Sequence, residues 1–588
     1  MKTNNRWLES LLHILVILAT VAAFMAAIQI RTDLATGWVD SAIYHSLFLS
    51  KAEQIERFGA IYFAGRWPWV LFGSLVFNAF PPALASAVFA YCVLSLIALS
   101  TYAFARCFMA PAAAALAGIL AACNLQVAQT VVAAYPSMAA VALFFLGAVI
   151  SVVSWRRDSW ALSFVAGLIY GVAVMTHPFI AVAGAPIYVV LLLVHRQAQT
   201  RRRLVMGLTA MIAGGLTLLP ISLLVFRGYA LSGEVLTTMW ATTKYSVVSG
   251  QGSWFSKTLN GFLLDGGAYL YFFAAVLAVV VGLARRGWRW SNIDVDHRIV
   301  HLLYLAPLVW LVVWDWLVRG VVMQYAFYQV FLYGVAALQL GLLAMQTGLF
   351  EKRPVVSLIV LVLVYLALQA AVLAGLDRGF GMLIVLSIMA AVLMATGLGQ
   401  MVTKRMGIAA GLSAILVLVA GVGAGLTRYG LSVHAPDVPG APAIETAKWA
   451  MKIAREHTGP TQPMLFAYNR DDYVLGPEYP VRNDRWDFIF DGRRSFFNVF
   501  DTVAGVYLWD RSMLVTDFSQ KLDPDLPNRM LSLFKTVSML VMWTNVDRRR
   551  EMSERLSVAG FRATETATGV FHSGPFDYSW AIFQLEKK

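Results

Sequence analysis

The chain carries a long succession of apolar stretches, each close to the length that crosses a lipid bilayer, which takes roughly 20 apolar residues in a helix. Its overall composition agrees, since 59% hydrophobic residues, only 13% charged residues and a mean hydropathy of +0.67 lie outside the range of soluble globular proteins. The sequence therefore predicts an all-α polytopic membrane protein with about 13 transmembrane helices. The predicted spans are residues 10–30, 83–105, 112–132, 138–154, 159–176, 178–194, 204–226, 267–284, 299–318, 326–346, 355–375, 381–400 and 406–426.

The distribution of lysine and arginine predicts the orientation of these spans. Basic residues in short loops stay on the cytoplasmic side of a membrane. If the N-terminus is inside, seventeen lysines and arginines fall on the inner segments of residues 1–426 and nine on the outer ones. An odd number of spans then places the polar tail, residues 427–588, outside the cytoplasm.

The tail has the pattern of a small folded domain of its own. A helix-like run covers 443–457, and strand-like runs cover 464–468, 538–543 and 580–585. A segment of this length can form its own hydrophobic core. We therefore predict an α/β domain over 427–588 and a transmembrane domain over 1–426, whose two long outer loops are residues 31–82 and 227–266.

The net charge of +13 does not indicate a nucleic-acid partner. The tail contains twenty basic and twenty acidic residues, so the excess positive charge belongs to the membrane part and reflects its topology. All three cysteines lie in or beside predicted spans, which excludes a disulfide framework in the tail. The expected surroundings are membrane lipids.

The first outer loop contains two carboxylates close to the end of the first span, Asp33 and Asp40. Apolar residues recur at helical spacing from Ile43 onward and predict an amphipathic helix at the membrane surface. Asp40 is placed either to cap this helix or to take part in chemistry. A second short helix is predicted from 69 to 80, because Pro68 suits a helix start.

Positive or ionisable side chains stand at three further outer positions. Arg66 belongs to Gly65-Arg66-Trp67-Pro68, Lys244 lies in the second long loop, and His177 ends the Gly-rich segment 167–178. Each also has a structural interpretation, because arginine can contact lipid headgroups and histidine often packs in a core. Trp67 suits either stacking on a sugar ring or the interfacial position that tryptophan favours. By contrast, Asp294-Val295-Asp296 is interpreted as a solvated turn on the inner side.

Taken together, these loop motifs resemble the GT-C superfamily of integral membrane glycosyltransferases, in particular the branch with the protein O-mannosyltransferases and the lipid A aminoarabinose transferase. Asp40-Ser41-Ala42-Ile43-Tyr44 matches the Asp-Glu-Ala-x-Tyr-like motif of that branch at three positions, with serine in place of glutamate. Arg66-Trp67-Pro68 resembles the basic residue and proline that end the first loop, with one residue inserted. His177 stands where the family's Gly-rich span has lysine, and Lys244 matches a basic residue that faces the lipid phosphate.

The resemblance implies an inverting glycosyltransferase of the bacterial inner (plasma) membrane that moves a sugar from a polyprenyl-phosphate donor to a hydroxyl of a cell-envelope glycan, lipid or protein. The transmembrane domain would be the catalytic one. It implies no cofactor, and a divalent metal stays open. Ser41 replaces the second acid, to which family members assign roles such as metal or acceptor binding. The implied roles are Asp40 as catalytic base, Arg66, Lys244 and His177 as donor-phosphate ligands, and Asp33, Tyr44 and Trp67 as possible substrate contacts.

Two other functions remain compatible with the sequence. One is an oligosaccharide-block transferase or ligase that uses a diphosphate-linked donor. The other is a transporter of lipid-linked sugars, although such proteins commonly show paired inverted halves with interrupted spans at corresponding positions. The sequence shows no such symmetry, which favours the transferase.

Overall fold

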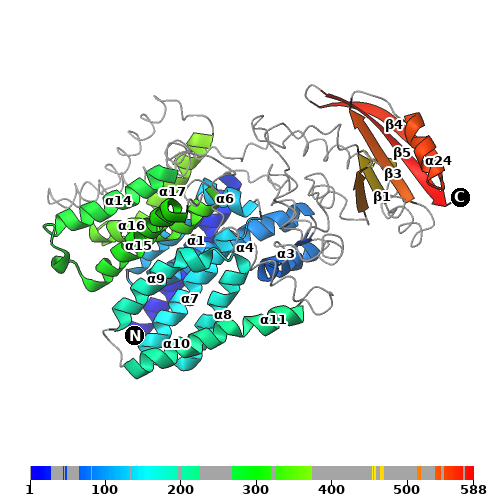
Figure 1. The fold of residues 1–588 in the computed structure, drawn as a ribbon. Helices are drawn as coiled ribbons and strands as arrows, with labels where there is room; N and C mark the ends of the chain where they lie inside the picture. The colour runs from blue at the N-terminus through cyan, green and yellow to red at the C-terminus, as the bar shows by residue number, and fades with distance from the viewer. Residues whose placement is uncertain are drawn as a thin grey trace. The chain divides into compact units, whose positions relative to one another are not determined.

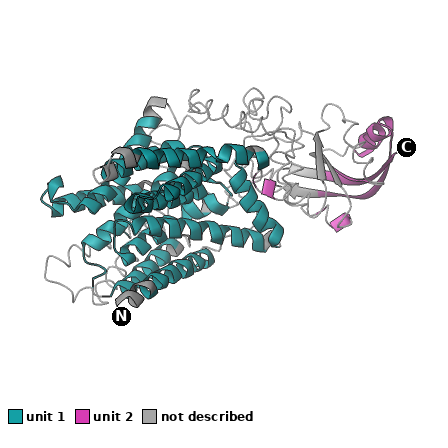
Figure 2. Ribbon diagram, turned by 90° about the horizontal axis from the view of Figure 1, so that it is seen from below, with its two compact units in different colours: residues 1–32, 65–431 teal, residues 33–64, 432–588 magenta. Residues whose placement is uncertain are grey.

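A computed structural model of the chain forms two compact units, residues 1–32 with 65–431, and residues 33–64 with 432–588 (Figure 2). The first unit is helical and the second is built around a β-sheet (Figure 1). The structure describes residues 2–27, 44, 47–48, 65–80, 82–132, 134–196, 201–225, 268–318, 326–351, 353–373, 417, 453, 456–458, 464–468, 513–517, 537–544, 549–573 and 576–587.

The helices of the first unit follow the apolar stretches of the sequence closely. Their bounds are α1 Lys2–Ala27, α3 Trp67–Ala79, α4 Pro82–Ala105, α5 Pro111–Ala122, α6 Leu125–Val132, α7 Ser137–Arg157, α8 Trp160–Thr176, α9 Ile180–Arg196, α10 Arg201–Leu216, α11 Leu218–Val225, α14 Ala268–Arg285, α15 Val295–Val318, α16 Ala326–Gln346 and α17 Pro354–Leu373. The short helix predicted at 69–80 is confirmed as α3, which carries Pro68 in its first turn.

Six of the described helices are long and apolar enough to cross a membrane, and α5 with α6 makes a seventh if this pair, bent by 54°, is one span. The first eleven predicted spans each coincide with described helices, but several of these, such as α8 and α9, are short. The last two, 381–400 and 406–426, lie outside the described residues. The helical membrane fold is thus confirmed, and thirteen spans stay a prediction.

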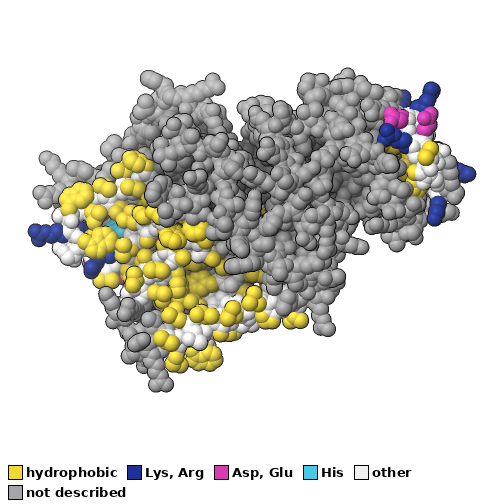
Figure 3. Space-filling model, in the orientation of Figure 1, with side chains coloured by type: hydrophobic (Ala, Val, Ile, Leu, Met, Phe, Trp, Pro, Cys, Tyr) yellow, Lys and Arg dark blue, Asp and Glu magenta, His cyan; other side chains and the backbone are white. Residues whose placement is uncertain are grey.

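The surface of the helical unit is apolar in the way a bilayer requires. Large aliphatic side chains are exposed along α1, α10, α15 and α17, among them Leu15, Ile212, Val309 and Leu363. Figure 3 shows hydrophobic side chains spread over the part of this unit that is described and visible there. Such a surface would be unfavourable in water but suits lipid chains.

The centre of the unit is α5, in which every residue from Ala112 to Ala122 is buried. Most of these residues are alanine, so neighbouring helices approach closely; α1, α4, α16 and α17 all contact α5. Small residues at helix contacts are typical of membrane interiors, where helices associate through close backbone packing.

The helix pair α8 and α10 packs still more closely. A Cβ atom added at Gly167 would overlap the backbone carbonyl of Met211, and one added at Gly214 would overlap that of Phe164. The two backbones therefore touch, and each contact position excludes any side chain. The Gly-rich run that precedes His177 thus has a packing role of its own.

A break interrupts the α5–α6 pair at Cys123-Asn124, and polar side chains satisfy its backbone. The Asn124 Oδ1 atom accepts a hydrogen bond from the Gln126 amide at 2.9 Å, and the Gln369 side chain donates to the Cys123 carbonyl at 2.7 Å. The Gln126 side chain donates to Gln329 at 3.1 Å and accepts from the Tyr333 hydroxyl. Backbone groups freed within a membrane protein need such partners, because lipid offers none.

The second unit contains a five-stranded mixed sheet with strand order β2-β1-β3-β5-β4. Strand β1 pairs in parallel with β2 and β3, and β5 pairs antiparallel with β3 and β4. Met552 and Leu556 of α24 pack with Val537, Met539 and Phe583 in one core cluster. The bounds are β1 Met464–Tyr468, β2 Met513–Asp517, β3 Val537–Thr544, α24 Arg549–Val558, β4 Phe561–Ser573 and β5 Phe576–Lys587.

The described residues confirm a small C-terminal sheet, and the bounds 427–588 of the predicted α/β domain stay a prediction. The three predicted strands fall within β1, β3 and β5. The helix predicted at 443–457 and the amphipathic helix predicted from Ile43 lie mostly outside the described residues.

Candidate functional site

The candidate site begins at Arg66, directly before α3. The Arg66 carbonyl accepts hydrogen bonds from the amides of Trp69 and Val70 at 3.0 and 3.1 Å, so the first turn of α3 fixes its backbone. The Arg66 side chain is only 1% exposed, and its guanidinium carbon lies 5.7 Å from the centre of the Tyr135 ring. A permanent positive charge is therefore held inside the protein against an aromatic face. The electron-rich face of the Tyr135 ring attracts the guanidinium electrostatically.

Tyr135 lies in the tight turn between α6 and α7. The preceding residue, Ala134, has a φ of 53°, in the left-handed region that costs a residue with a Cβ atom about 1 kcal/mol. The turn is closed by the hydrogen bond from the Tyr135 amide to the Thr130 carbonyl at 3.0 Å. The Trp69 indole donates to the Ala134 carbonyl at 2.7 Å, which ties α3 directly to this turn.

His177 reaches the same place from the end of α8. Its amide donates to the Ala173 carbonyl at 2.9 Å, so it caps the helix. The imidazole centre is 5.7 Å from the Tyr135 ring and 5.5 Å from the ring of Phe331 on α16. Tyr135 thus contacts both Arg66 and His177.

The environment of His177 keeps its imidazole neutral. Burial lowers the pKa of His177 well below the ordinary value of 6.5, and the positive charge of Arg66 lowers it further. A neutral imidazole still offers one N–H donor and one acceptor. Its contribution to anion binding would therefore be a hydrogen bond, with Arg66 supplying the charge.

Trp67, the residue after Arg66, is held by a side-chain hydrogen bond to α11. Its indole nitrogen donates to the Ser222 hydroxyl at 2.8 Å, and that hydroxyl donates to the Leu218 carbonyl at 2.7 Å. The start of α3 is therefore bonded to α11 as well as to the α6–α7 turn. These bonds fix the first turn of α3, which directly follows Arg66.

The structure thus brings together two of the predicted phosphate ligands, Arg66 and His177. Tyr44 is buried in the second unit, where its ring stacks on Phe48 at 6.4 Å. Asp33, Asp40 and Lys244 lie outside the described residues, so their roles stay predictions. In the described part of the chain, no group of three or more His, Cys, Asp or Glu side chains could hold a metal ion.

Sequence reasoning missed Tyr135, Trp69 and Phe331. The available signal was the dipeptide Tyr135-Pro136, which falls in a very short connection between two predicted spans at the same end as Arg66 and His177. An aromatic residue with a polar tip in such a connection is placed to contact neighbouring loops.

Chemically, the site combines one buried guanidinium, one neutral imidazole and several aromatic faces. A buried guanidinium favours a planar or tetrahedral oxyanion, which its fork of N–H donors can bind at two points. These residues of the helical unit could therefore bind an anion such as a phosphate.

Comparison with known proteins gives structural neighbours only. No family model and no curated protein matches the sequence. The structure is similar to ArnT from Cupriavidus metallidurans bound to undecaprenyl phosphate, with 14% identity, 97% of each chain covered and a TM-score of 0.45. It is also similar to the oligosaccharyltransferase AglB from Archaeoglobus fulgidus in complex with an inhibitory peptide and a dolichol-phosphate, with 12% identity, 90% of this chain and 69% of that chain covered, and a TM-score of 0.36.

Proposed function

We propose that this chain is an integral membrane glycosyltransferase that moves a sugar from a polyprenyl-phosphate donor to a hydroxyl group of a cell-envelope acceptor. The observation that carries the proposal is the buried Arg66 guanidinium against Tyr135, with His177 on the same ring. This cationic group lies at one end of a unit whose surface is apolar. An amphiphilic donor needs both features, an apolar path for its chain and positive charge for its phosphate.

The leaving group explains why arginine is needed and a general acid is not. When the bond between C1 of the sugar and the phosphate oxygen breaks, the electron pair stays on the phosphate, whose low pKa makes it a good leaving group. Negative charge then increases on the phosphate oxygens. A preorganised guanidinium stabilises this charge more in the transition state than in the ground state, which is how such groups accelerate reactions.

The remaining roles follow from the loop motifs. Asp40 would accept the proton of the acceptor hydroxyl as its oxygen attacks C1 from the face opposite the phosphate, so the configuration at C1 inverts. Lys244 would supply a second positive charge from the other long loop. His177 would donate an N–H to a phosphate oxygen, and Asp33, Tyr44 and Trp67 would contact the substrates.

The test uses the full-length protein reconstituted in lipid nanodiscs with synthetic polyprenyl-phosphate sugars. Release of free polyprenyl phosphate and formation of glycosylated acceptor are both followed by mass spectrometry. We expect equimolar amounts of the two products, and loss of both in Arg66→Ala. The exposed Arg562 in β4 of the second unit provides a matched control, because Arg562→Gln removes the same charge from a strand that carries none of the proposed site residues.

Two outcomes would replace this proposal. Turnover of diphosphate-linked donors alone would indicate a block transferase or ligase. Movement of an intact lipid-linked sugar between leaflets of proteoliposomes, without any cleavage of the sugar–phosphate bond, would indicate a transporter.

A further inference from the structure

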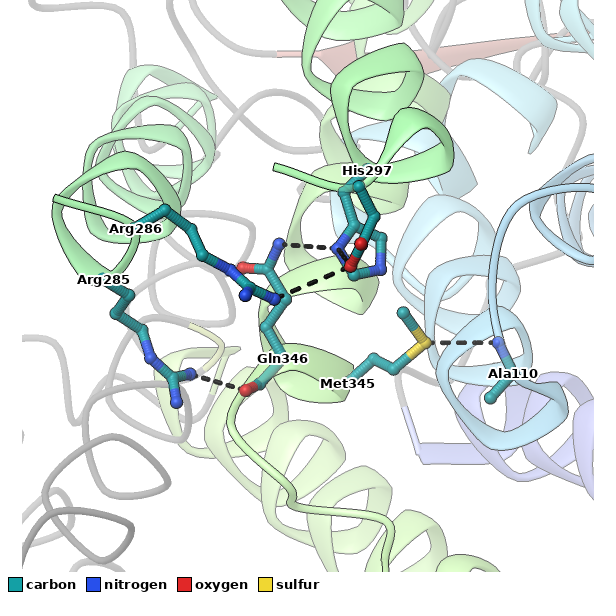
Figure 4. Close-up of polar contacts among 7 residues, drawn as sticks. Ala110, Arg285, Arg286, His297, Met345 and Gln346 are labelled. Atoms are coloured by element: carbon teal, nitrogen blue, oxygen red, sulfur yellow. Dashed lines mark hydrogen bonds and ion pairs between the residues drawn. The ribbon is translucent and has the colours of Figure 1, made fainter. Parts of the chain in front are cut away.

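A second cluster of charged and aromatic residues lies at the opposite end of the helical unit from Arg66. There the α4–α5 turn and the ends of α7, α14 and α16 are bonded to one another. Arg156 donates to the Cys107 carbonyl at 3.1 Å, and the Ala110 amide donates to the Met345 sulfur at 3.3 Å. Arg285 donates to the Gln346 carbonyl at 2.6 Å, as Figure 4 shows. Hydrogen bonds therefore join the helix ends at this end of the unit, which we call the platform: the α4–α5 turn and the ends of α7, α14 and α16.

The most exposed part of the platform is the turn between α14 and α15, residues 284–292, which we call the Arg-Trp turn. Its sequence from Arg285 to Trp290 is Arg-Arg-Gly-Trp-Arg-Trp. Gly287 and Trp288 both have positive φ, 68° and 61°, and the Trp288 amide donates to the Leu283 carbonyl at 3.0 Å. The left-handed backbone reverses the chain directly after α14 and leaves the Trp288 side chain 66% exposed.

Both ends of the Arg-Trp turn are braced. The Asn292 side chain donates to the Arg286 carbonyl at 3.2 Å, and the Arg286 guanidinium lies 3.6 Å from the Asp294 carboxylate. Asp294 also lies 3.6 Å from His297, whose ring accepts a hydrogen bond from the Gln346 side chain at 3.5 Å (Figure 4). These contacts thus fix the backbone that carries the side chains of the Arg-Trp turn.

The charge of the turn is not neutralised within it. Residues 284–298 contain four arginines and two aspartates. Arg289 stands between Trp288 and Trp290, all three are exposed, and Arg289 forms no ion pair with any residue that the structure describes. Figure 3 shows lysine and arginine side chains gathered where Figure 1 places this turn.

We propose that the Arg-Trp turn binds the headgroup of an anionic phospholipid in the leaflet on its side of the membrane, which the distribution of basic residues predicts to be the cytoplasmic one. Arg286 and Arg289 would contact the phosphate, which guanidinium groups bind at two points. Trp288 and Trp290 would lie at the headgroup level, where tryptophan is favoured. The site is independent of the proposed transferase chemistry.

An intact lipid suits this surface better than a soluble anion. The two exposed indoles follow the apolar α14, and Val295 at the start of α15 is 59% exposed. A soluble phosphate would use the arginines and leave this apolar area in water. A phospholipid covers both parts at once, its phosphate on the arginines and its upper chain region against the indoles.

The test measures lipid binding to the full-length protein in detergent by native mass spectrometry, with dioleoylphosphatidylglycerol and dioleoylphosphatidylcholine as probes. We expect the wild type to prefer phosphatidylglycerol. Each arginine near a membrane surface contributes about 1 kcal/mol, so Arg289→Gln should weaken phosphatidylglycerol binding by roughly five-fold. Phosphatidylcholine binding should fall less, because the choline cation of that lipid offsets the charge of its phosphate. Trp288→Ala should weaken binding of both lipids, and a monodisperse gel-filtration peak establishes that each variant is folded.

Two matched controls make the proposal falsifiable. Arg562→Gln removes an equally exposed arginine from the sheet of the second unit, and Trp160→Ala removes a 67% exposed tryptophan from the start of α8. Equal losses in the controls would overturn the proposal by showing a generic effect of charge or of interfacial tryptophan. Full competition by inorganic phosphate, with Trp288→Ala unaffected, would overturn it in favour of a soluble anion.

Discussion

The guanidinium carbon of Arg66 lies 5.7 Å from the centre of the Tyr135 ring, although four helices, α3 to α6, separate the two residues in the chain. The contact depends on the hydrogen bond from the Trp69 indole to the Ala134 carbonyl, which ties the start of α3 to the α6–α7 turn. The aromatic face therefore fixes where the charge of Arg66 is presented. This relationship makes Tyr135 a positioning residue in the proposed site.

Replacing Tyr135 should separate the effect of its ring from that of its hydroxyl. A desolvated cation–π contact is worth about 2 kcal/mol, so Tyr135→Leu should weaken donor binding by roughly thirty-fold. Tyr135→Phe keeps the ring and should retain most of the affinity. Donor affinity by isothermal titration and the single-turnover rate check this. Equal losses in the Phe and Leu variants would mean that the hydroxyl, and not the ring, is what matters.

Arg66 and Lys244 should share the donor phosphate. A hydrogen bond to a charged group contributes about 1.5 to 3 kcal/mol, so Arg66→Ala should weaken donor binding by roughly ten- to hundred-fold. Arg66→Lys should recover only part, because a single ammonium lacks the two-point contact of guanidinium. The Arg66/Lys244 double alanine variant completes the cycle. Strict additivity with unchanged donor affinity would place the phosphate elsewhere.

Asp40→Asn should fold and insert in the membrane yet lose transfer by about 10² or more, the scale of losing a general base. Asp33→Asn should have a milder effect. The measurement is the rate of acceptor glycosylation at saturating donor. The reverse order of the two variants would assign the base to Asp33.

The buried His177 should make the protein sensitive to acid. Its folded pKa lies well below 6.5, whereas the unfolded chain takes up a proton near that value. Below pH 6.5 the unfolded state therefore binds more protons, and stability falls as the pH falls toward the folded pKa. The thermal midpoint in detergent should drop between pH 7.5 and pH 5.0 by more in the wild type than in His177→Asn. Parallel drops in the two proteins would show that other groups cause the acid sensitivity.

The helices of the first unit could be predicted because lipid solvation imposes long apolar runs on the sequence. The same reasoning could not fix the number of spans, because α5 and α6 form a bent pair and α8 has only 17 residues. Apolar content alone does not distinguish a full crossing from a broken or short helix. Packing partners decide this, and they are not visible in hydropathy.

The candidate site was predictable in part for a different reason. Arg66 and His177 stand out because ionisable residues are costly near a membrane interior. Tyr135 does not, since tyrosine is common at membrane interfaces, and its importance comes from the left-handed Ala134 and the bond from Trp69. Such contacts depend on the tertiary arrangement of loops that are far apart in the sequence.

The glycine contacts between α8 and α10 fix the position of α8 along its partner helix. Because the backbones touch at Gly167 and Gly214, α8 cannot slide along its partner without driving a side chain into a carbonyl group. One residue of sliding would move the end of α8, and His177 with it, by about 1.5 Å along the helix axis. The glycines therefore hold His177, at the end of α8, in one axial position, and a side chain added at Gly167, ten residues before the imidazole, would shift His177 relative to the Tyr135 ring without contacting either residue.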